Sequence, residues 1–280
     1  MIGEENNPLV SVIMPNYNNE KYLAEAIESI LNQTYEHFEF IIIDDCSTDN
    51  SWHIIQNYAK KDNRIKMFRN EVNLKIVKTR NKGFELMSPH SKYIAIFDSD
   101  DVSMPERLEK QINFSEKNVD YGLIGSHTLI IDENSKIIGY RKYETDLKKI
   151  IKNMVKKNQF AQPSVMIRKS VLDDVGYYDE KYTRCQDYDL WFRIAKSFKI
   201  ENLDEFLIKY RISKTQGKST HLKESLDFTL DIQKKWLFDK KFFSIFGVFY
   251  YIGEHLMYFL PSKVVLKLFK VLNYDNMGII

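Results

Sequence analysis

Short apolar runs separated by longer amphipathic stretches predict alternating strands and helices in the first hundred residues. The runs typical of buried strands are residues 9–14, 38–43, 65–68 and 93–97. After the first run, apolar residues recur at the spacing of one helical face: Leu23, Ala26, Ile27, Ile30 and Leu31. Two more helices are expected, one capped by residues 47–49 and one over about residues 76–87. Repeated units of this kind predict an α/β fold with a doubly wound, Rossmann-like and mostly parallel sheet flanked by helices.

After residue 112 the pattern becomes mixed. A hairpin is expected from residues 121–131 and 136–140, which flank a turn. A basic helix is expected over about residues 146–157, and a short strand at residues 164–167. Asp187 is expected to start a helix with this apolar face: Leu190, Trp191, Ile194, Ala195 and Phe198. The polar residues 213–220 show no apolar periodicity and predict a loop.

Polar residues follow three of the predicted strands at the point where each strand ends: Pro15-Asn16-Tyr17, Asp44-Asp45 and Asp98-Ser99-Asp100-Asp101. Because ligands of doubly wound sheets bind beyond the carboxyl ends of the strands, these clusters are expected to meet at one edge. The three carboxylates of the last cluster repel one another unless a cation joins them, so they predict a mount for a divalent metal. The alternative is a solvated acidic turn, because residues 103–106 look like a helix start.

Composition narrows the class of protein. The chain has 280 residues, enough for one large domain with an appendage or for two small domains. Its 41 basic and 39 acidic residues give no global attraction to nucleic acid. Cys46 and Cys185 are the two cysteines, which argues against a disulfide framework and fits a reducing compartment. The fingerprints G-x-G-x-x-G and G-x-x-x-x-G-K are absent, so neither a dehydrogenase nor a P-loop enzyme is supported.

The chain shows no secretory signal, because Glu4 and Glu5 precede a first apolar run that is short and ends at Pro15. The protein is therefore expected in the cytoplasm, with a peripheral position on the inner face of the cytoplasmic membrane left open. Residues 242–260 are strongly apolar but are interrupted by Glu254 and His255. They fall short of the roughly 20 clean residues that a spanning helix needs.

Several motifs around the strand ends resemble those of glycosyltransferase family 2, the inverting, metal-dependent enzymes with the GT-A fold. The matching segments follow the family's order within about residues 9–211: residues 10–18, 29–34, 43–49, 79–83, 98–101 and 186–191. The resemblance implies a nucleotide-sugar donor, a divalent metal, and transfer to an acceptor hydroxyl with inversion.

The resemblance also implies roles for the strand-end residues. Asp98 and Asp100 match the family's Asp-x-Asp pair, with Asp100 expected to coordinate the metal directly and Asp101 to help. An all-oxygen site suits Mg²⁺ or Mn²⁺, which would offset the negative charge that a diphosphate leaving group develops. The donor and its metal are expected to bind along these residues: Pro15, Tyr17, Asp45, Arg80, Asp98, Ser99 and Asp100.

Each of these assignments has a structural alternative. The Tyr17 ring is expected to stack on a nucleobase, or else to pack on a neighbouring helix. Asp45 resembles the family's base-reading carboxylate, whereas Asp44 and Asp49 suit turn and cap positions, with Asp49 mostly structural. Arg80 is expected to donate to the base or the diphosphate; the competing account is an exposed arginine on a helix surface.

Asp187 matches the family's catalytic base, which takes the proton from the attacking hydroxyl. Its structural alternative is an N-cap aspartate, and both roles are compatible. Asp189 is expected to project elsewhere, and Trp191 to belong to the core because it shares a helical face with apolar neighbours.

The chain departs from the family at the expected metal-side histidine. The family often carries histidine two residues after a Tyr-Arg pair, and here Ser213 follows Tyr210-Arg211 at that distance. His221 is one substitute, although a solvated surface histidine is the alternative. Lys214 or Lys218 would otherwise neutralise the diphosphate directly.

The tail from about residue 225 combines lysines with aromatic residues, among them Lys240, Lys241, Phe246 and Phe249. This pattern suits an amphipathic helix on an anionic membrane, or else an extension that packs on the catalytic domain or on a second subunit. We therefore divide the chain into a GT-A domain, residues 1–218, and a helical extension, residues 219–280. Within the domain, a nucleotide-binding half is expected to end at about residue 101, with an acceptor half over about residues 102–218.

The function predicted from this resemblance is inverting transfer of a hexose or N-acetylhexosamine from a nucleotide-sugar, a UDP-sugar in particular. The acceptor is expected to be a glycan or glycolipid of surface polysaccharide or lipooligosaccharide synthesis. Two rivals remain: a protein that binds a sugar nucleotide without catalysis, and a phosphatase or phosphotransferase that uses Asp98 as nucleophile.

Overall fold

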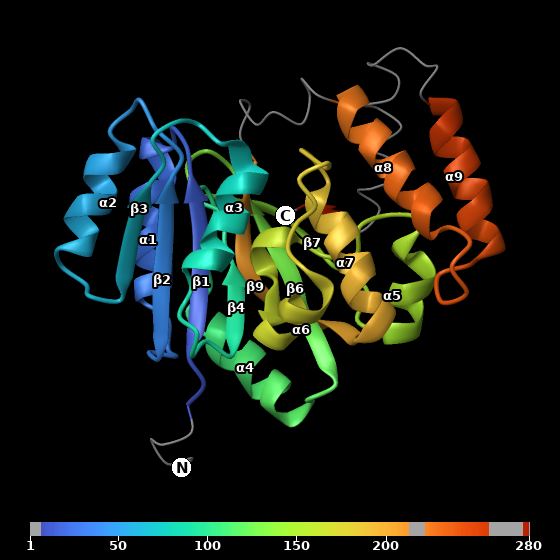
Figure 1. Cartoon of the computed structure of the whole chain (residues 1–280), viewed down its shortest axis with the longest axis horizontal. Coiled ribbons are helices and arrows are strands. Elements are labelled where there is room, and N and C mark those ends of the chain that lie inside the picture. Colours follow the sequence, from blue (N-terminus) through green and yellow to red (C-terminus); the bar gives the residue numbers. More distant parts are fainter. Residues whose placement is uncertain (1–6, 213–221, 258–276, 280) are drawn as a thin grey trace.

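Four parallel strands form the first half of the sheet, as the apolar runs predict. The structure is a computed structural model and describes residues 7–212, 222–257 and 277–279. The strands lie in the order β3–β2–β1–β4, with these bounds: β1 Val10–Asn16, β2 Phe38–Asp44, β3 Ile65–Arg69 and β4 Tyr93–Ile96. The helices between them are α1 Glu20–Leu31, α2 Ser51–Ala59 and α3 Lys75–Leu86 (Figure 1).

The second half of the sheet is largely antiparallel, so the sheet as a whole is mixed. β8 (Met166–Arg168) runs antiparallel to β4 and to β6 (Tyr121–Ile131), and β6 forms the expected hairpin with β7 (Ile137–Arg141). The long strand β9 (Lys199–Arg211) pairs in parallel with β6 and antiparallel with the short β5 (Val102–Ser103). The prediction of a mostly parallel sheet is confirmed only for the strands with helical crossovers, because hairpin and short-strand connections permit antiparallel pairing.

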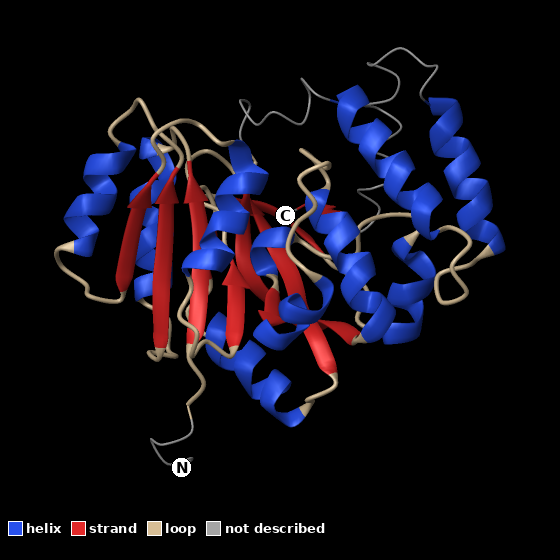
Figure 2. Cartoon of the chain, viewed as in Figure 1, coloured by secondary structure: helices blue, strands red, loops and turns tan. Residues whose placement is uncertain are grey.

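Helices cover both faces of the sheet (Figure 2). Along β1 the side chains alternate: Val10, Val12 and Met14 enter the core with α1, α2 and α4 (Arg107–Lys117), whereas Ile13 enters the opposite core. The opposite core is formed by α3 and by the later helices α5 Leu147–Met154, α6 Lys169–Val175 and α7 Gln186–Ser197. Because successive side chains of a strand point to opposite faces, the sheet has one apolar core on each face.

Gly83 lets α3 lie directly on the parallel strands. A Cβ atom at this position would be 2.4 Å from Ile13 Cγ2 and 3.1 Å from Ile43 Cδ1. Any side chain there would push the helix away from β1 and β2. The close approach also fixes Arg80, which is nearly one helical turn earlier, close to the strand ends.

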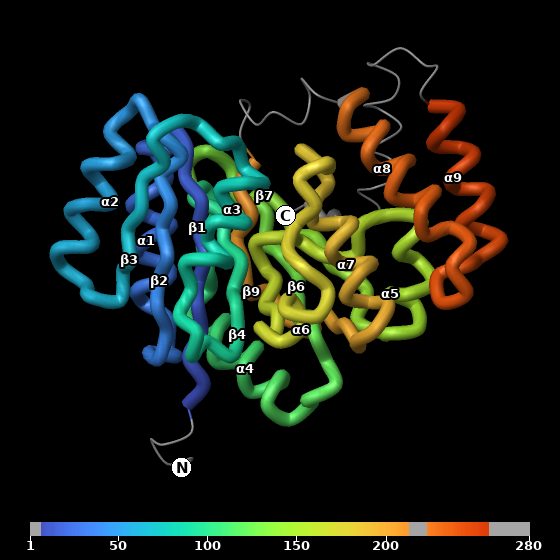
Figure 3. Tube along the Cα trace, viewed as in Figure 1, coloured from blue at the N-terminus to red at the C-terminus, as the bar shows by residue number. Residues whose placement is uncertain are grey.

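The C-terminal part packs on the sheet domain through aromatic residues. α8 (Leu222–Trp236) and α9 (Ile245–Met257) confirm the expected helical extension and lie at the end of the molecule opposite α2 (Figure 3). The Trp236 ring stacks on Phe192 of α7 at a centroid distance of 5.5 Å, and Phe242 meets both rings edge-on. None of the described helices is both long and apolar enough to cross a membrane.

One strand near the C-terminus was not predicted from the sequence. β10 (Met277–Ile279) pairs antiparallel with β7 and adds a strand at the sheet edge. A run of only a few residues carries too little periodicity to be recognised as a strand. The expected loop at residues 213–220 lies outside the described residues.

Glu254 is a buried carboxyl between α8 and α9, and it predicts a pH-dependent stability. Burial raises its pKa from 4.5 to about 7, against the lowering effect of the hydrogen bond that Gln233 donates. Because the folded-state pKa is raised, folding disfavours the charged form, and the resulting penalty grows from about pH 4.5 to about pH 7 and is constant above. We expect Glu254→Gln to increase the free energy of unfolding by about 3 kcal/mol at pH 8 and by much less at pH 5. Urea unfolding at both pH values measures this, and a variant effect of equal size at pH 5 and pH 8 would contradict it.

Candidate functional site

Two cavities meet at the carboxyl ends of β1, β2 and β4. The first, here the strand-end cavity, has a volume of about 690 Å³. All seven predicted donor residues line it: Pro15, Tyr17, Asp45, Arg80, Asp98, Ser99 and Asp100. The sheet edge thus brings together side chains from four separate segments, as the parallel strand order requires.

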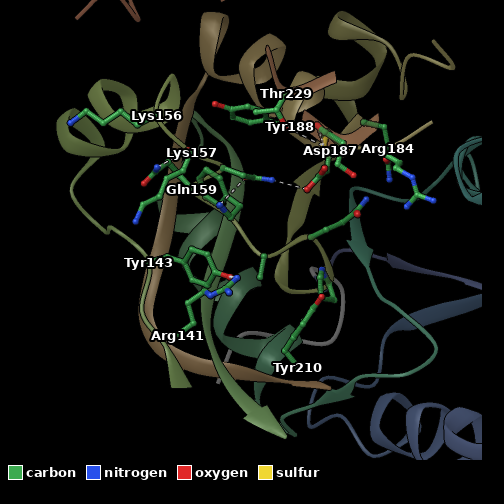
Figure 4. Close-up of a pocket in the computed structure, with 18 of the residues that line it drawn as sticks. Arg141, Tyr143, Lys156, Lys157, Gln159, Arg184, Asp187, Tyr188, Tyr210 and Thr229 are labelled. Carbon is green, nitrogen blue, oxygen red and sulfur yellow. Dashed lines mark hydrogen bonds between the residues drawn. The ribbon is translucent and has the colours of Figure 1, made fainter. Parts of the chain in front are cut away.

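The second cavity, here the Asp187 cavity, has a volume of about 710 Å³ and contains the predicted base. Figure 4 shows Asp187 and Arg184 on one side of it, with Lys157 and Gln159 across from them. Arg80 and Asp98 line both cavities, so the two spaces share a wall at these residues. Groups bound in the two cavities would therefore both lie beside these two side chains.

Arg80 is buried at this shared wall. It donates to the Asp98 carboxylate through one nitrogen and to Gln162 Oε1 through the other, at 2.9 Å. Burial would lower the pKa of Arg80, but the Asp98 carboxylate, Tyr178 and Asp187 outweigh it and raise the pKa. The alternative of an exposed helix-surface arginine is wrong, because this side chain is only 4% exposed.

Asp187 lies in the first turn of α7, is partly buried and lines the cavity. Its Oδ2 accepts a hydrogen bond of 2.8 Å from Asn158 Nδ2. Burial raises the pKa of Asp187, against the lowering effects of Arg80 and of the Asn158 hydrogen bond. A carboxylate with a raised pKa is a stronger base, which suits proton abstraction. The expected N-cap role is wrong, since α7 begins at Gln186 and its N-cap is Cys185.

Asp45 organises the loop that closes one side of the strand-end cavity. Its Oδ1 accepts from Asn70 Nδ2 and from the Leu74 amide, each at 2.8 Å, and its Oδ2 accepts from the Lys75 amide at 2.9 Å. The expected base-reading role stays a prediction. Tyr17 is 49% exposed at the cavity rim, so its ring is accessible to a ligand.

The acids expected to be structural have structural partners. Asp49 accepts from the Glu20 amide at 2.9 Å and from the Ser51 amide at 3.0 Å, which joins the starts of α1 and α2. Asp44 is fully buried, accepts from Asn16, and pairs with Arg69. Neither carboxylate is part of the cavity lining.

The acidic residue two positions after Asp187 points away from the cavity. Asp189 is fully buried and pairs with Arg193 and Lys235, each at 2.8 Å. Trp191 is buried in the core, as its helical face predicts. Two aspartates of one helical turn therefore have separate surroundings, one in a cavity and one in an ion-pair network.

Arginines from α3, α4 and β9 contact or lie near the Asp98–Asp101 cluster. Asp101 is only 1% exposed and its Oδ1 accepts from the Arg211 amide at 2.8 Å, while Arg211 Nε donates to the Asp100 carbonyl at 2.7 Å. Arg107 lies buried in the same region, and burial lowers its pKa to about 9 against the opposing charges of Asp101 and Asp98. Asp101 was expected to help bind the metal, but its side chain is buried and does not line the strand-end cavity.

The remaining acids fit a divalent metal only together with oxygen atoms of a ligand. Among residues 7–212, 222–257 and 277–279, no group of three His, Cys, Asp or Glu side chains is arranged to hold a metal ion. Asp98 and Asp100 still line the strand-end cavity. Mg²⁺ typically takes one or two carboxylates and completes its shell with substrate phosphates and water. Ser213, Lys214, Lys218 and His221 lie outside the described residues.

The backbone is strained beside both cavities. Five non-glycine residues of the described chain have positive φ: Asn18, Cys46, Lys75, Ser135 and Cys185. Asn18 follows Tyr17, Cys46 follows Asp45, and the Lys75 and Cys185 side chains line the cavities. Such conformations concentrate at ligand sites because the surrounding structure must hold them in place.

Sequence reasoning missed the neutral partners at the shared wall. Asn158 bonds Asp187, Gln162 bonds Arg80, and Tyr178 accepts from Gln162 Nε2 at 3.0 Å. Asn158 and Gln162 lie between α5 and β8, where the chain shows no periodic pattern. No local signal distinguishes these amides from ordinary loop residues.

The sequence matches known glycosyltransferases over most of its length. Residues 11–176 match the family model described as glycosyl transferase family 2. The uncharacterized glycosyltransferase MJ1057 of Methanocaldococcus jannaschii is 39% identical over 277 residues, covering 96% of this chain and 94% of that protein. The UDP-Glc:alpha-D-GlcNAc-diphosphoundecaprenol beta-1,3-glucosyltransferase WfgD of Escherichia coli is 31% identical over 218 residues, covering 77% and 82%.

The fold matches a solved structure as well. S. aureus TarS 1–349 in complex with UDP superposes with a TM-score of 0.65 at 20% identity, covering 91% of this chain and 73% of that chain. The chain spans 44% of the longer TarS chain, with a TM-score of 0.63. At this identity the likeness concerns the fold alone, and it confirms the expected GT-A architecture.

Proposed function

Because the chain belongs to glycosyltransferase family 2, we propose that it transfers a hexose or N-acetylhexosamine from a UDP-sugar to a hydroxyl of a glycan or glycolipid. One observation carries this proposal: the strand-end cavity and the Asp187 cavity share Arg80 and Asp98. A donor in the first cavity and an acceptor in the second would meet at that wall. The names of two similar proteins support the donor, since WfgD uses UDP-Glc and TarS binds UDP.

The donor is assigned to the strand-end cavity. Tyr17 stacks on the nucleobase, and Asp45 accepts from its ring N–H while holding the adjoining loop. Pro15 and Ser99 shape the wall, and Arg80 faces the diphosphate. The guanidinium is a strong partner for phosphate oxygens because it donates several hydrogen bonds in a fixed geometry.

Asp98 and Asp100 are the residues that hold Mg²⁺ or Mn²⁺ in this proposal. The metal, when bound, offsets the negative charge of the departing diphosphate. The chain's own contribution on the same side is the Arg80 cation, which Asp98 and Gln162 hold in position.

Asp187 is the general base. The acceptor hydroxyl attacks the anomeric carbon from the side opposite the diphosphate, its proton passes to the Asp187 carboxylate, and the bond to the diphosphate breaks. A single displacement of this kind inverts the configuration at that carbon. Asn158 orients the carboxylate through its hydrogen bond to Oδ2.

The acceptor is assigned to the Asp187 cavity. We assign the reaction to surface polysaccharide or lipooligosaccharide synthesis. This pathway is supported by the name of WfgD, which acts on a diphosphoundecaprenol-linked sugar. The division into a donor half up to residue 101, an acceptor half up to residue 218 and an extension from residue 219 follows the same assignment.

A donor screen tests the function. We expect metal-dependent release of UDP from one UDP-sugar when a glycan acceptor is present, and binding of UDP by calorimetry. Calorimetry without detectable UDP binding would overturn the donor assignment. UDP binding without transfer to any acceptor would favour a protein that binds sugar nucleotides without catalysis, and metal-dependent phosphate release without a nucleotide-sugar would favour a phosphatase.

The stacking role of Tyr17 gives a sharper test of the donor cavity. Tyr17→Ala is expected to weaken UDP binding about tenfold, because base–aromatic stacking is worth about 1–3 kcal/mol. Tyr17→Phe is the matched control and should bind UDP nearly as well as the natural protein, since it keeps the ring. Calorimetry with UDP measures both, and equal affinity of the alanine variant would show that the ring does not contact the base.

A further inference from the structure

The outward side of α9 is an apolar surface at one end of the molecule. Five large side chains form this surface, here the α9 face, and each is between 48% and 68% exposed: Ile245, Phe246, Phe249, Ile252 and Leu256. Four of them follow one another at the spacing of a single helical face. Of the fourteen exposed large apolar side chains in the described part of the chain, seven lie within residues 238–256. Such a concentration marks an interaction surface rather than scattered surface residues.

The inner side of the same helix packs against the rest of the chain through a few buried residues. Gly247, Glu254 and Met257 are buried, and Glu254 accepts a hydrogen bond from Gln233 of α8. The only acidic residue of α9 therefore points inward, and the α9 face carries no charged side chain. The helix is thus held in a fixed orientation with its apolar side outward.

Positive charge lies beside the N-terminal part of the α9 face. Lys240 and Lys241 precede the helix and are exposed, and Lys156 lies 5.9 Å from the Phe246 ring centroid. Asp239, which is close in sequence, pairs with Lys196 and so contributes little negative charge. An apolar stripe rich in phenylalanine with lysines at its margin matches an anionic lipid surface in both polarity and charge. A second copy of this chain would instead bring the same lysines face to face.

The α9 face is adjacent to the Asp187 cavity. Glu254 and Met257, on the inner side of α9, line that cavity together with Leu226 and Thr229 of α8. The cavity and the apolar surface are therefore two sides of one helix. Whatever surface binds α9 lies within a helix diameter, roughly 10 Å, of the cavity wall.

We propose that the α9 face inserts into the surface of an anionic membrane and thereby holds the Asp187 cavity beside the leaflet that carries a lipid-linked acceptor. The membrane contact rests on the α9 face itself, and the part about the acceptor rests on the proposed function. The exposed phenylalanines enter the boundary between headgroups and acyl chains, roughly 5–10 Å deep, while the lysines meet the headgroups.

Sedimentation with lipid vesicles tests the membrane contact. The full chain is expected to bind vesicles of phosphatidylglycerol and phosphatidylcholine, and the variant Phe249→Ser/Leu256→Ser to bind at least about tenfold more weakly. A matched control, Val72→Ser/Val119→Ser, removes two apolar side chains of similar exposure from the β3–α3 and α4–β6 connections and should bind like the natural protein. Lys240→Gln should weaken binding to anionic vesicles only. Equal binding by the natural protein and the α9 variant would overturn the proposal.

Two further readouts separate the alternatives. Light scattering reports the oligomeric state: a dimer that becomes a monomer in the α9 variant, without vesicle binding, would show that a second copy covers the face and would overturn the proposal. Transfer to a short water-soluble acceptor should be unchanged in the α9 variant, whereas transfer to an acceptor embedded in vesicles should fall at least about tenfold. Absence of transfer to both acceptors in the natural protein would refute the proposed function and leave the vesicle result to decide the membrane contact.

Discussion

Asp187→Asn is expected to lower the rate of sugar transfer about a thousandfold while the affinity for UDP stays unchanged. The substitution keeps the size of the side chain, and its amide oxygen can still accept from Asn158. It removes only the group that takes the acceptor proton. Initial rates with the preferred UDP-sugar, together with calorimetry for UDP, measure the two quantities separately. A rate within tenfold of the natural protein would show that another group is the base.

The same substitution should not destabilise the fold. Burial raises the pKa of Asp187, so the folded protein disfavours its charged form and bears a cost at neutral pH. Replacing the carboxylate with an uncharged amide removes that cost. The free energy of unfolding at pH 7 is therefore expected to equal or exceed that of the natural protein. An inactive variant that is also less stable would point to a structural cause.

Asp189→Asn is the matched control on the same helix. Asp189 is fully buried between Arg193 and Lys235, and loss of its charge leaves two cations without a common partner. We expect a loss of about 3 kcal/mol in the free energy of unfolding, with the transfer rate of the folded variant nearly unchanged. The two aspartates thus separate catalysis from stability within one helical turn.

The strand-end cavity follows from the sequence because its cause is topological. Parallel strands place their carboxyl ends at one edge, so Tyr17, Asp45 and Asp98 could be placed together from the order of apolar runs alone. Arg80 was predicted from a motif, yet its burial depends on the close approach of α3 at Gly83. The alternation of side chains along a strand predicts which face of the sheet each side chain lies on. It does not predict how closely a helix such as α3 packs on that face.

The electrostatic environment of the acidic cluster was not predictable from the sequence. Arg107 and Arg211 reach the cluster from α4 and β9, which join it only in the folded chain. The resembled family often carries a histidine two residues after the Tyr-Arg pair, where this chain has Ser213. In the structure, Arg211 itself bonds two residues of the cluster. Long-range ion pairs have no fixed sequence spacing, in contrast to pairs along one helix.

The arginines reduce the need for a metal to offset the negative charge of the cluster. Three carboxylates in four residues repel one another, and a metal is one way to offset their charge. Here Arg80 pairs with Asp98, and the Arg211 amide together with the buried Arg107 charge acts on Asp101. The folded chain therefore supplies part of the compensation itself. In the proposed reaction, the metal would therefore serve the leaving diphosphate rather than hold the cluster together.

Asp100→Asn is expected to lower the transfer rate by about two orders of magnitude and to raise the Mn²⁺ concentration for half-maximal rate. The Asp100 carboxylate is partly exposed in the strand-end cavity, where it is assigned to the metal. Rates measured across a Mn²⁺ or Mg²⁺ titration give both values.

Asp101→Asn, one residue away, is the control that separates a metal-binding role from a structural role. An asparagine oxygen can still accept from the Arg211 amide, but the variant loses the buried charge that faces Arg107. Its free energy of unfolding should fall by about 1–3 kcal/mol, and its metal dependence should stay unchanged. The opposite outcome, a shifted metal dependence for Asp101→Asn and none for Asp100→Asn, would make Asp101 the ligand. It would also require its buried side chain to turn toward the cavity when the donor binds. The two variants thus distinguish adjacent aspartates with different roles: Asp100 in the metal dependence of transfer, and Asp101 in the stability of the contact with β9.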